Sequence, residues 1–169
     1  MAIVRKDKML AGYNGNLESV IVHSTTSLNS TLEITNGLFV KVGNLMAGER
    51  EVKQAILAGT ADVAEDILFI HNSEVMYDSK KFKLADFRIA RGKVSRAYRL
   101  YNGDIITLTT DLFQGAVAVG DILVAHTAGK LGKDATAQAT AKVKFLVIEN
   151  AGRELDPEMD AFAVQVIRA

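Results

Sequence analysis

Apolar and polar residues alternate along several short stretches of this chain, and alternation with a period of two predicts β-strands with one buried face. The clearest example spans residues 31–42, where alternating runs flank the pair Asn36-Gly37. An Asn-Gly pair between two such runs is the strongest short-range signal for a β-hairpin, because both residues tolerate the positive φ of a tight turn. The pattern therefore predicts a hairpin over 31–42.

Two Gly-Asp pairs, Gly103-Asp104 and Gly120-Asp121, organise the middle of the sequence, and each is followed at once by a β-branched apolar run. Glycine supplies a permissive turn backbone and aspartate bonds its own turn, so both pairs are interpreted as hairpin corners. Strand, turn, strand, turn, strand is the simplest interpretation of residues 93–124. Together with the other apolar runs, the predicted strands are 19–24, 67–71, 94–101, 104–110, 121–126, 142–150 and 161–167.

Three segments leave alternatives open or lack a clear period. Residues 48–59 fit a short helix that ends at Gly59, and they equally fit a strand with its charged residues on a solvated face. Residues 80–93 fit neither period cleanly. Residues 128–141 are small and polar except for Leu131, so a mobile surface loop is expected there.

The predicted architecture is all-β or β-dominated: a barrel or sandwich of short strands with at most one or two short helices, for which 49–58 is the candidate segment. Residues 1–18 are interpreted as a polar N-terminal arm, either loosely held or extended and ordered only against a neighbour. Residues 19–169 are expected to form a single β-rich domain, which suits a chain of 169 residues.

The composition narrows the function classes. Because the chain has no cysteine, disulfides, thiolate catalysis and cysteine-ligated zinc are excluded. Twenty basic and twenty acidic residues cancel, and zero net charge argues against a general nucleic-acid binder. The first residues lack the apolar core of a signal peptide, and no apolar run approaches the ~20 residues of a membrane helix. We expect no membrane association, no nucleic-acid partner and a protein made in a cytosol.

Signals for catalysis are weak. The three histidines, His23, His71 and His126, each lie in or at the end of an apolar strand, and no nucleophile-elbow sequence accompanies them. No glycine string matches a phosphate-binding loop or a dinucleotide fingerprint. We therefore expect no enzyme activity, no catalytic residue and no cofactor.

Signals for a metal site are equally weak. His71, Glu74 and Asp78 have a spacing that would gather their side chains only on a helix, whereas their surroundings predict strand and turn. The acidic residues of 154–160 surround Pro157 and lack a suitably spaced bidentate glutamate, so they predict a solvated turn rather than a calcium loop. No metal site is expected.

A basic cluster interleaved with aromatic residues is the strongest interaction signal in the sequence. Arginine and tyrosine are enriched at the centres of protein interfaces, and basic residues with aromatic ones also suit nucleic-acid backbones. On a strand, however, the charges of this cluster are split across both faces, which does not suit a single phosphate-binding stripe. Contact with an acidic protein surface is favoured. The candidate partner-binding residues are Tyr13 in the arm and Arg88, Arg91, Arg96, Tyr98, Arg99 and Tyr101 in the cluster.

Four stretches resemble the small head proteins of tailed bacteriophages known as decoration or cement proteins. These are GLFVKVGNLMAGEREV (37–52), SEVMYD (73–78), LADFRIARGKVSRAYRLYNGDIITLT (84–109) and VGDIL (119–123). The resemblance covers roughly residues 37–124, and its motifs are turns and strand patterns. It implies a β-rich, non-enzymatic protein that binds the outside of the capsid lattice in many copies, often as trimers.

On this reading, the partners are the major capsid protein and further copies of the chain, a trimer being favoured. The location is the exterior of the virion, after synthesis in the host cytoplasm. The alternative function is a β-barrel module that binds a small ligand or a carbohydrate, which requires a concave site with exposed aromatic rings. A hydrolase on an unfamiliar β-fold is a third reading.

Overall fold

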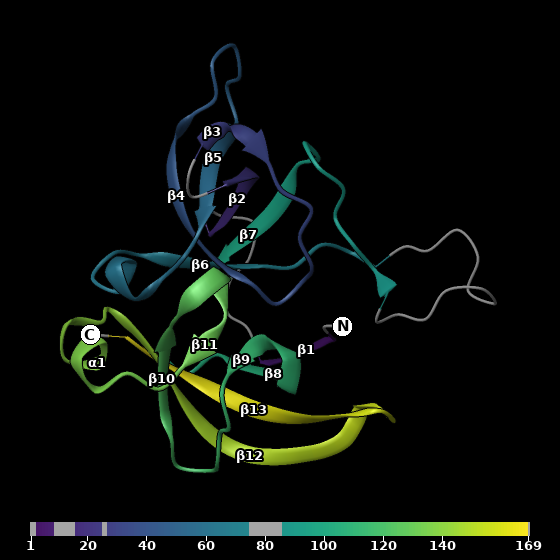
Figure 1. Ribbon diagram of the computed structural model, residues 1–169, viewed down its shortest axis with the longest axis vertical. Coiled ribbons are helices and arrows are strands. Elements are labelled where there is room, and N and C mark those ends of the chain that lie inside the picture. Colours follow the sequence, from purple (N-terminus) through teal and green to yellow (C-terminus); the bar gives the residue numbers. More distant parts are fainter. Residues whose placement is uncertain (1–2, 9–15, 25–26, 75–85, 169) are drawn as a thin grey trace.

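The structure is a computed structural model that describes residues 3–8, 16–24, 27–74 and 86–168. Strands dominate these residues and form a closed barrel and a second, seven-stranded sheet, accompanied by one short α-helix (Figure 1). The prediction of an all-β fold with few helices is confirmed.

Five strands build the barrel. They lie in the order β2-β5-β4-β6-β7, and β7 pairs back with β2 to close the circle. The β2–β5 pair is parallel and the other four pairs are antiparallel. β3 (Ser27–Thr31) pairs with the end of β2, outside the closed set. The barrel strands are β2 (Leu17–Ser24), β4 (Phe39–Leu45), β5 (Val52–Leu57), β6 (Ile67–Ile70) and β7 (Ser95–Arg99).

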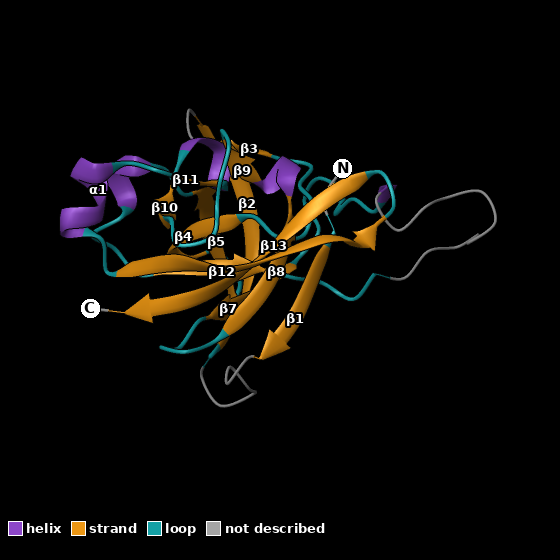
Figure 2. Cartoon of the chain, turned by 90° about the horizontal axis from the view of Figure 1, so that it is seen from below, coloured by secondary structure: helices purple, strands orange, loops and turns teal. Residues whose placement is uncertain are grey.

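The second sheet has the order β1-β8-β13-β12-β10-β11-β9, and Figure 2 shows β1, β8, β13 and β12 side by side. The longest strands of this sheet are β12 and β13, which form a hairpin that turns at Pro157. Three irregularities in its register bend this hairpin. The strands are β1 (Val4–Lys8), β8 (Ile105–Thr109), β9 (Phe113–Gln114), β10 (Ile122–Ala125), β11 (Leu131–Gly132), β12 (Val143–Asp156) and β13 (Met159–Arg168).

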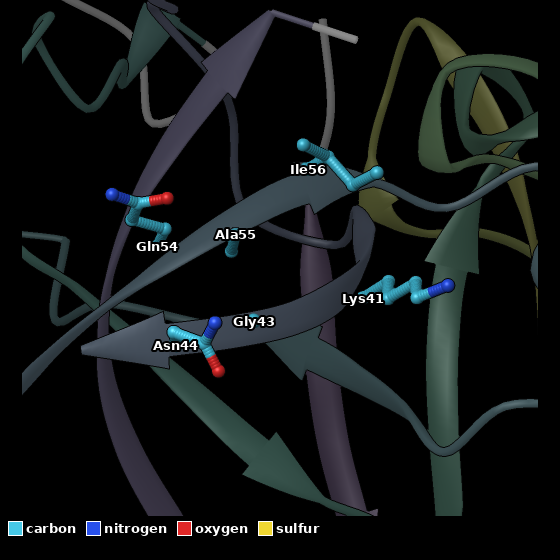
Figure 3. A pocket seen from close by; sticks show the side chains of 6 residues that line it. All are labelled: Lys41, Gly43, Asn44, Gln54, Ala55 and Ile56. Atoms are coloured by element: carbon cyan, nitrogen blue, oxygen red, sulfur yellow. The ribbon is translucent and has the colours of Figure 1, made fainter. Parts of the chain in front are cut away.

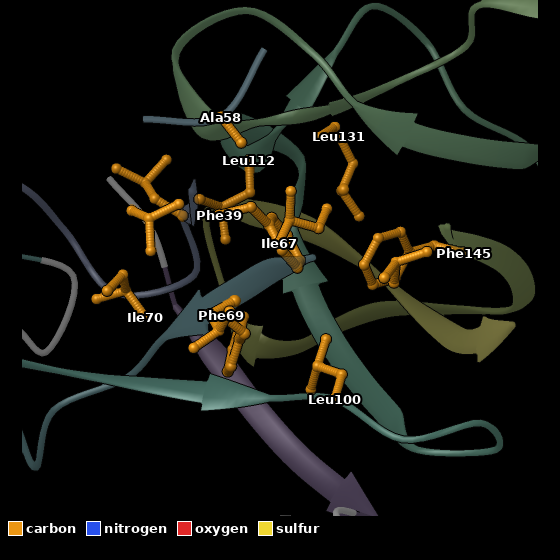
Figure 4. Packing of buried hydrophobic residues seen from close by; sticks show 14 of the residues in the cluster. Phe39, Ala58, Ile67, Phe69, Ile70, Leu100, Leu112, Leu131 and Phe145 are labelled. Atoms are coloured by element: carbon orange, nitrogen blue, oxygen red, sulfur yellow. The ribbon is translucent and has the colours of Figure 1, made fainter. Parts of the chain in front are cut away.

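Phenylalanines join the barrel to the sheet. Phe39 and Phe69 are cross-strand partners on β4 and β6, and both are completely buried. The Phe39 ring meets the ring of Phe145 on β12 edge to face, with centroids 4.9 Å apart (Figure 4). Barrel and sheet therefore share one continuous apolar cluster, in which aromatic pairs of this geometry are favourable.

The hairpin predicted over 31–42 is wrong. Asn36-Gly37 forms a turn, but the segments on its two sides do not pair with each other. β4 pairs with β5 and β6, while Ile34 makes an isolated bridge with Ile89. The buried Asn36 amide donates to the carbonyl of Asn72 (3.0 Å) and accepts from its N–H (2.8 Å), so the turn is anchored by a distant segment.

Within residues 48–59 the structure has the strand β5 (Val52–Leu57), so of the two alternatives the strand is confirmed and the short helix near 49–58 is wrong. β5 follows β4 after a turn and pairs with it antiparallel. The α-helix is α1 (Ala135–Thr140), where the side chain of Asp134 accepts hydrogen bonds from the N–H groups of Thr136 and Ala137, both at 2.9 Å. These bonds satisfy two donors that the start of a helix leaves unpaired.

The surface loop predicted over 128–141 is also wrong, since this stretch contains both α1 and β11. Leu131 is completely buried, and β11 pairs with β10 and with β9. The three short 3₁₀-helices of the described residues are η1 (Thr60–Asp62), η3 (Thr110–Leu112) and η4 (Thr127–Gly129). Small residues occur in solvated loops and in closely packed segments alike, so their presence in 128–141 does not distinguish the two.

The remaining predicted strands are confirmed to within a few residues, and β12 and β13 are longer than expected. Their arrangement differs from the simple succession predicted over 93–124, because β7 belongs to the barrel and β8 to the second sheet. The turn at Gly103-Asp104 carries the chain from one to the other. Of the ambiguous segment 80–93, the described part contains the bridge at Ile89 and a turn that ends at Lys93.

The N-terminal residues that the structure describes lie in the second sheet. β1 pairs antiparallel with β8, and Ile3 and Val4 are buried. Residues 3–8 of the expected arm are therefore held by the chain's own sheet. Residues 9–15 lie outside the described residues, and Tyr13 lies with them.

Candidate protein-binding surface

The basic cluster lies on a short loop and on β7, and asparagine side chains position it. The Oδ1 atom of Asn72 accepts a hydrogen bond from the N–H of Arg96 (2.7 Å), and the Nδ2 group of Asn72 donates to the carbonyl of Val94 (3.5 Å). Asn72 is itself held by the buried Asn36 amide. These bonds fix the segment that follows β6 against the start of β7. The backbone that carries Val94 and Arg96 is therefore held in one position.

Four basic side chains of this cluster are exposed: Arg88, Arg91, Lys93 and Arg96. They lie on both sides of Val94 in the sequence, and Val94 is 45% exposed and is one of the few large apolar residues at the described surface. We call these five residues the basic face. A central apolar residue with a charged rim is the usual arrangement of a protein-binding surface.

The other predicted contact residues face the fold instead. Arg99 forms ion pairs with Asp66 (3.3 Å) and Glu18 (3.9 Å). The Tyr101 hydroxyl donates to the side-chain oxygen of Asn16, and Tyr98 is half-buried against the apolar cluster. The seven predicted contact residues therefore include exposed arginines and also residues that contact the protein's own strands. Residue type alone does not distinguish these two groups.

Arg99 belongs to a chain of alternating charges that sequence reasoning missed. Glu18 also pairs with Lys53 (2.9 Å), and Asp66 also pairs with Arg168 (2.6 Å), whose guanidinium donates a second bond to the carbonyl of Leu100 (2.6 Å). The network links three barrel strands to the end of β13. Its members are separated by up to 150 positions in the sequence, so no local signal could have revealed it.

A small hollow of about 200 Å³ opens over the bulge between β4 and β5 (Figure 3). Its charged member, Lys41, contacts the carboxylates of Asp62 (3.4 Å) and Glu65 (3.5 Å). The hydrogen bond to Asp62 and the proximity of Glu65 raise the pKa of Lys41 above its ordinary value, so it remains charged at neutral pH. A charged lysine is a poor nucleophile. The lining residues are Lys41, Gly43, Asn44, Gln54, Ala55 and Ile56.

A larger hollow of about 410 Å³ lies between the barrel and η4. Its described lining consists of small and aliphatic residues with the carboxylate of Asp62, and it includes no aromatic ring. Sugar-binding sites use aromatic faces, so this lining does not favour the carbohydrate alternative. The lining residues are Leu32, Leu57, Ala58, Gly59, Thr60, Ala61, Asp62, Thr127 and Ala128.

The three histidines lie in separate surroundings. His23 is buried in β2, with neither ring nitrogen hydrogen-bonded. The ring of His71 stacks beside Phe69 at 6.2 Å, and Nδ1 of His126 accepts a hydrogen bond from the N–H of Thr127 (2.8 Å). Within the described ranges, no three histidine or carboxylate side chains gather in a way that would hold a metal ion. Asp78, the third residue of the spacing considered above, lies outside those ranges.

No helix among the residues described combines the length and apolar character needed to cross a membrane. Comparisons with protein-family models, with curated proteins and with solved structures give no match for this chain. The basic face, held by the hydrogen bonds of Asn72, is therefore the main candidate for a functional surface among the described residues.

Proposed function

We propose that this chain is a non-enzymatic structural protein of a tailed-phage virion, which binds the outer surface of the capsid and stabilises its lattice. The proposal combines the resemblance of residues 37–124 to decoration proteins with the basic face. It makes the major capsid protein the principal partner and the virion exterior the location, after synthesis in the host cytoplasm. Further copies of the chain are the second partner, a trimer being favoured.

The basic face is the observation that carries the proposal. It combines four exposed cations with the exposed side chain of Val94 within nine positions of the sequence, and the hydrogen bonds of Asn72 hold the backbone at Val94 and Arg96. A backbone that is already ordered loses less entropy on binding. The positive charge of this face favours an acidic protein surface as the partner. Long-range attraction between opposite charges also speeds the encounter.

Lattice stabilisation follows from linkage. A protein that binds the assembled shell and not the free subunits stabilises the assembled state by its own binding free energy. With many copies on each shell, modest affinity at each site is sufficient. No reaction needs to be catalysed in this role.

Co-sedimentation with phage shells tests the proposal. Purified protein is mixed with procapsids and with mature heads that lack decoration, and the bound fraction is measured against the concentration of capsid subunits. Saturation at a fixed number of copies per shell is expected. The variant Arg91→Glu/Arg96→Glu is expected to lose at least about tenfold in affinity, because it places like charges against an acidic partner.

The matched control is Arg50→Glu/Lys142→Glu, which makes the same change of charge at two exposed positions away from the basic face. It is expected to bind shells like the wild type. Failure of the wild-type protein to sediment with any of several shells would sink the proposal, and equal binding by both variants would remove the basic face from it.

A further inference from the structure

A hollow of about 290 Å³ opens where η3 and β9 meet the start of β13. Its lining includes Phe113 and Phe162, whose rings pack edge to face with centroids 6.0 Å apart. The loop of residues 115–117 also lines it, together with the hydroxyl-bearing Thr110 and the carboxylate-bearing Asp160. We call it the β13 hollow.

The surroundings of the β13 hollow are acidic. Residues 149–160, at the closed end of the β12–β13 hairpin, include five acidic residues and one basic residue. Asp160 is 56% exposed, and its ion pair with Arg153 is long at 3.7 Å and exposed on both sides. Such a pair is easily exchanged for a better one. Val119, two positions after the lining residue Val117, is the most exposed of the large apolar residues in the described chain at 58%.

A long basic side chain suits this geometry. Lysine and arginine lay an apolar stem on a hydrophobic surface while the charged head remains near water or a carboxylate. Here the two phenylalanines supply apolar lining, and the exposed Asp160 of the same lining supplies the counter-charge. The faces of aromatic rings add attraction for a cation.

The same chain carries the complementary surface. Residues 86–99 include five basic residues and one acidic residue, the inverse of residues 149–160. Two valines are exposed as well, Val94 in the basic face and Val119 shortly after the lining residue Val117. Opposite charges around apolar centres are the complementarity that interfaces use, and the zero net charge of the whole chain leaves little repulsion between copies.

We infer that the β13 hollow of one copy receives the basic face of a second copy of this chain. The inference rests on the proposed function, since it assigns the acidic surface that the basic face meets to a neighbouring copy on the shell, which leaves direct contact with the capsid protein to other parts of the molecule. The two surfaces are different parts of the molecule, so the contact is head-to-tail. Contacts of this kind close into rings, of which the proposed trimer is one, when the rotation between copies allows it.

Charge reversal on each side tests the inference. The hollow variant is Glu158→Lys/Asp160→Lys, and the basic-face variant is Arg91→Glu/Arg96→Glu. Self-association is measured by sedimentation velocity over a concentration series in low and in high salt. The wild type is expected to associate, and more weakly in high salt because screening shortens the reach of its charges. Each variant alone is expected to associate at least about tenfold more weakly, because like charges then face each other.

Mixing the two variants is the decisive step. The lysines of the hollow variant then face the glutamates of the basic-face variant, so hetero-association is expected to return toward wild-type strength. Glu49→Lys/Glu51→Lys reverses two exposed acidic residues of the β4–β5 turn and is expected to associate like the wild type. A monomeric wild type, self-associating variants, or a mixture that stays monomeric would each overturn the inference.

The two proposals fail separately. Wild-type protein that self-associates but does not sediment with shells would contradict the shell-binding function and leave the contact between copies intact. Wild-type protein that saturates shells but stays monomeric in solution, with shell binding unchanged in the hollow variant, would contradict the contact between copies alone.

Discussion

Gly129 lies directly against the backbone of Phe39. A Cβ atom at Gly129 would be 2.6 Å from the Phe39 carbonyl oxygen, closer than real Cβ contacts come, and its φ of +73° is one that glycine favours. The N–H of Gly129 donates to the carbonyl of Ala58, whose own N–H donates to Phe39 (both 2.9 Å). This contact joins η4 to the barrel.

Replacing Gly129 with alanine is expected to destabilise the protein by about 3 kcal/mol or more, since it combines a left-handed backbone cost with a backbone clash. Gly48→Ala is the matched control, because Gly48 has a φ of +83° and open space around it. Only the backbone cost of roughly 1–2 kcal/mol is expected there. Urea unfolding of both variants measures the difference, and equal losses would show that the close approach has no energetic role.

The contact between Phe39 and Phe145 is expected to couple the barrel to the second sheet. In a double-mutant cycle with Phe39→Leu and Phe145→Leu, the coupling free energy should be about 0.5–1.5 kcal/mol, the range for aromatic pairs of this geometry. Phe162, whose ring pairs with Phe113, provides the comparison. The cycle of Phe39→Leu with Phe162→Leu should be additive to within about 0.5 kcal/mol. Additivity in both cycles would contradict the proposed role of the ring pair.

The Asp66 carboxylate bridges Arg99 and Arg168, so Asp66→Asn is expected to leave two cations poorly paired. Because these side chains remain 25–40% exposed, the expected loss is about 1–2 kcal/mol rather than the value for a fully buried pair. Asp160→Asn breaks the exposed pair with Arg153 and should cost at most about 0.5 kcal/mol. Chemical unfolding measures both, and a loss at Asp66 no larger than that at Asp160 would show that the network contributes no stability.

Asp121 is expected to make stability depend on pH in the acid range. Its carboxylate accepts hydrogen bonds from the N–H of Ala118 (2.7 Å) and from Lys133 (3.1 Å), and the first of these is the main cause that lowers its pKa below the ordinary 3.8. A carboxyl with a lowered folded pKa binds protons more weakly when folded than when unfolded. Its contribution is therefore complete above pH 3.8 and is lost as the pH falls through the folded pKa.

The variant Asp121→Asn should accordingly be less stable than the wild type at neutral pH, and the two should converge as the solution is acidified. Lys133→Met removes only the lesser of the two contacts and should show a smaller difference. Thermal unfolding at a series of pH values measures the effect. A difference between Asp121→Asn and the wild type that stays constant down to strongly acidic pH would contradict the assignment.

Much of the strand content could be predicted because strand periodicity is local. The runs that became β6, β8, β12 and β13 each carry enough apolar or β-branched residues to favour a half-buried strand wherever the strand pairs. The N-terminal arm shows the limit of this reasoning. Val4 is buried and β1 pairs with β8, about a hundred positions away, which no pattern within the first residues could indicate.

The candidate surface likewise could be predicted only in part from the sequence. Arg96 and Arg99 have the same side chain three positions apart, yet Arg96 is exposed and Arg99 pairs with Asp66 and Glu18. Their different roles depend on which strands lie beside β7. Similarly, the lining of the β13 hollow brings together Phe113 and Phe162, which are distant in sequence and whose rings meet only in the folded structure.

By itself, the sequence determined that this chain is built of short strands, that its charges balance and that its Asn-Gly and Gly-Asp pairs form turns. Those properties follow from the conformational preferences of single residues and their near neighbours. The tertiary structure alone decided which strands pair, that Asn36-Gly37 is a turn without a hairpin, and that Arg96 belongs to a surface while Arg99 belongs to a network. These outcomes depend on contacts between distant residues, and such contacts form only when burial of the shared apolar cluster brings the segments together.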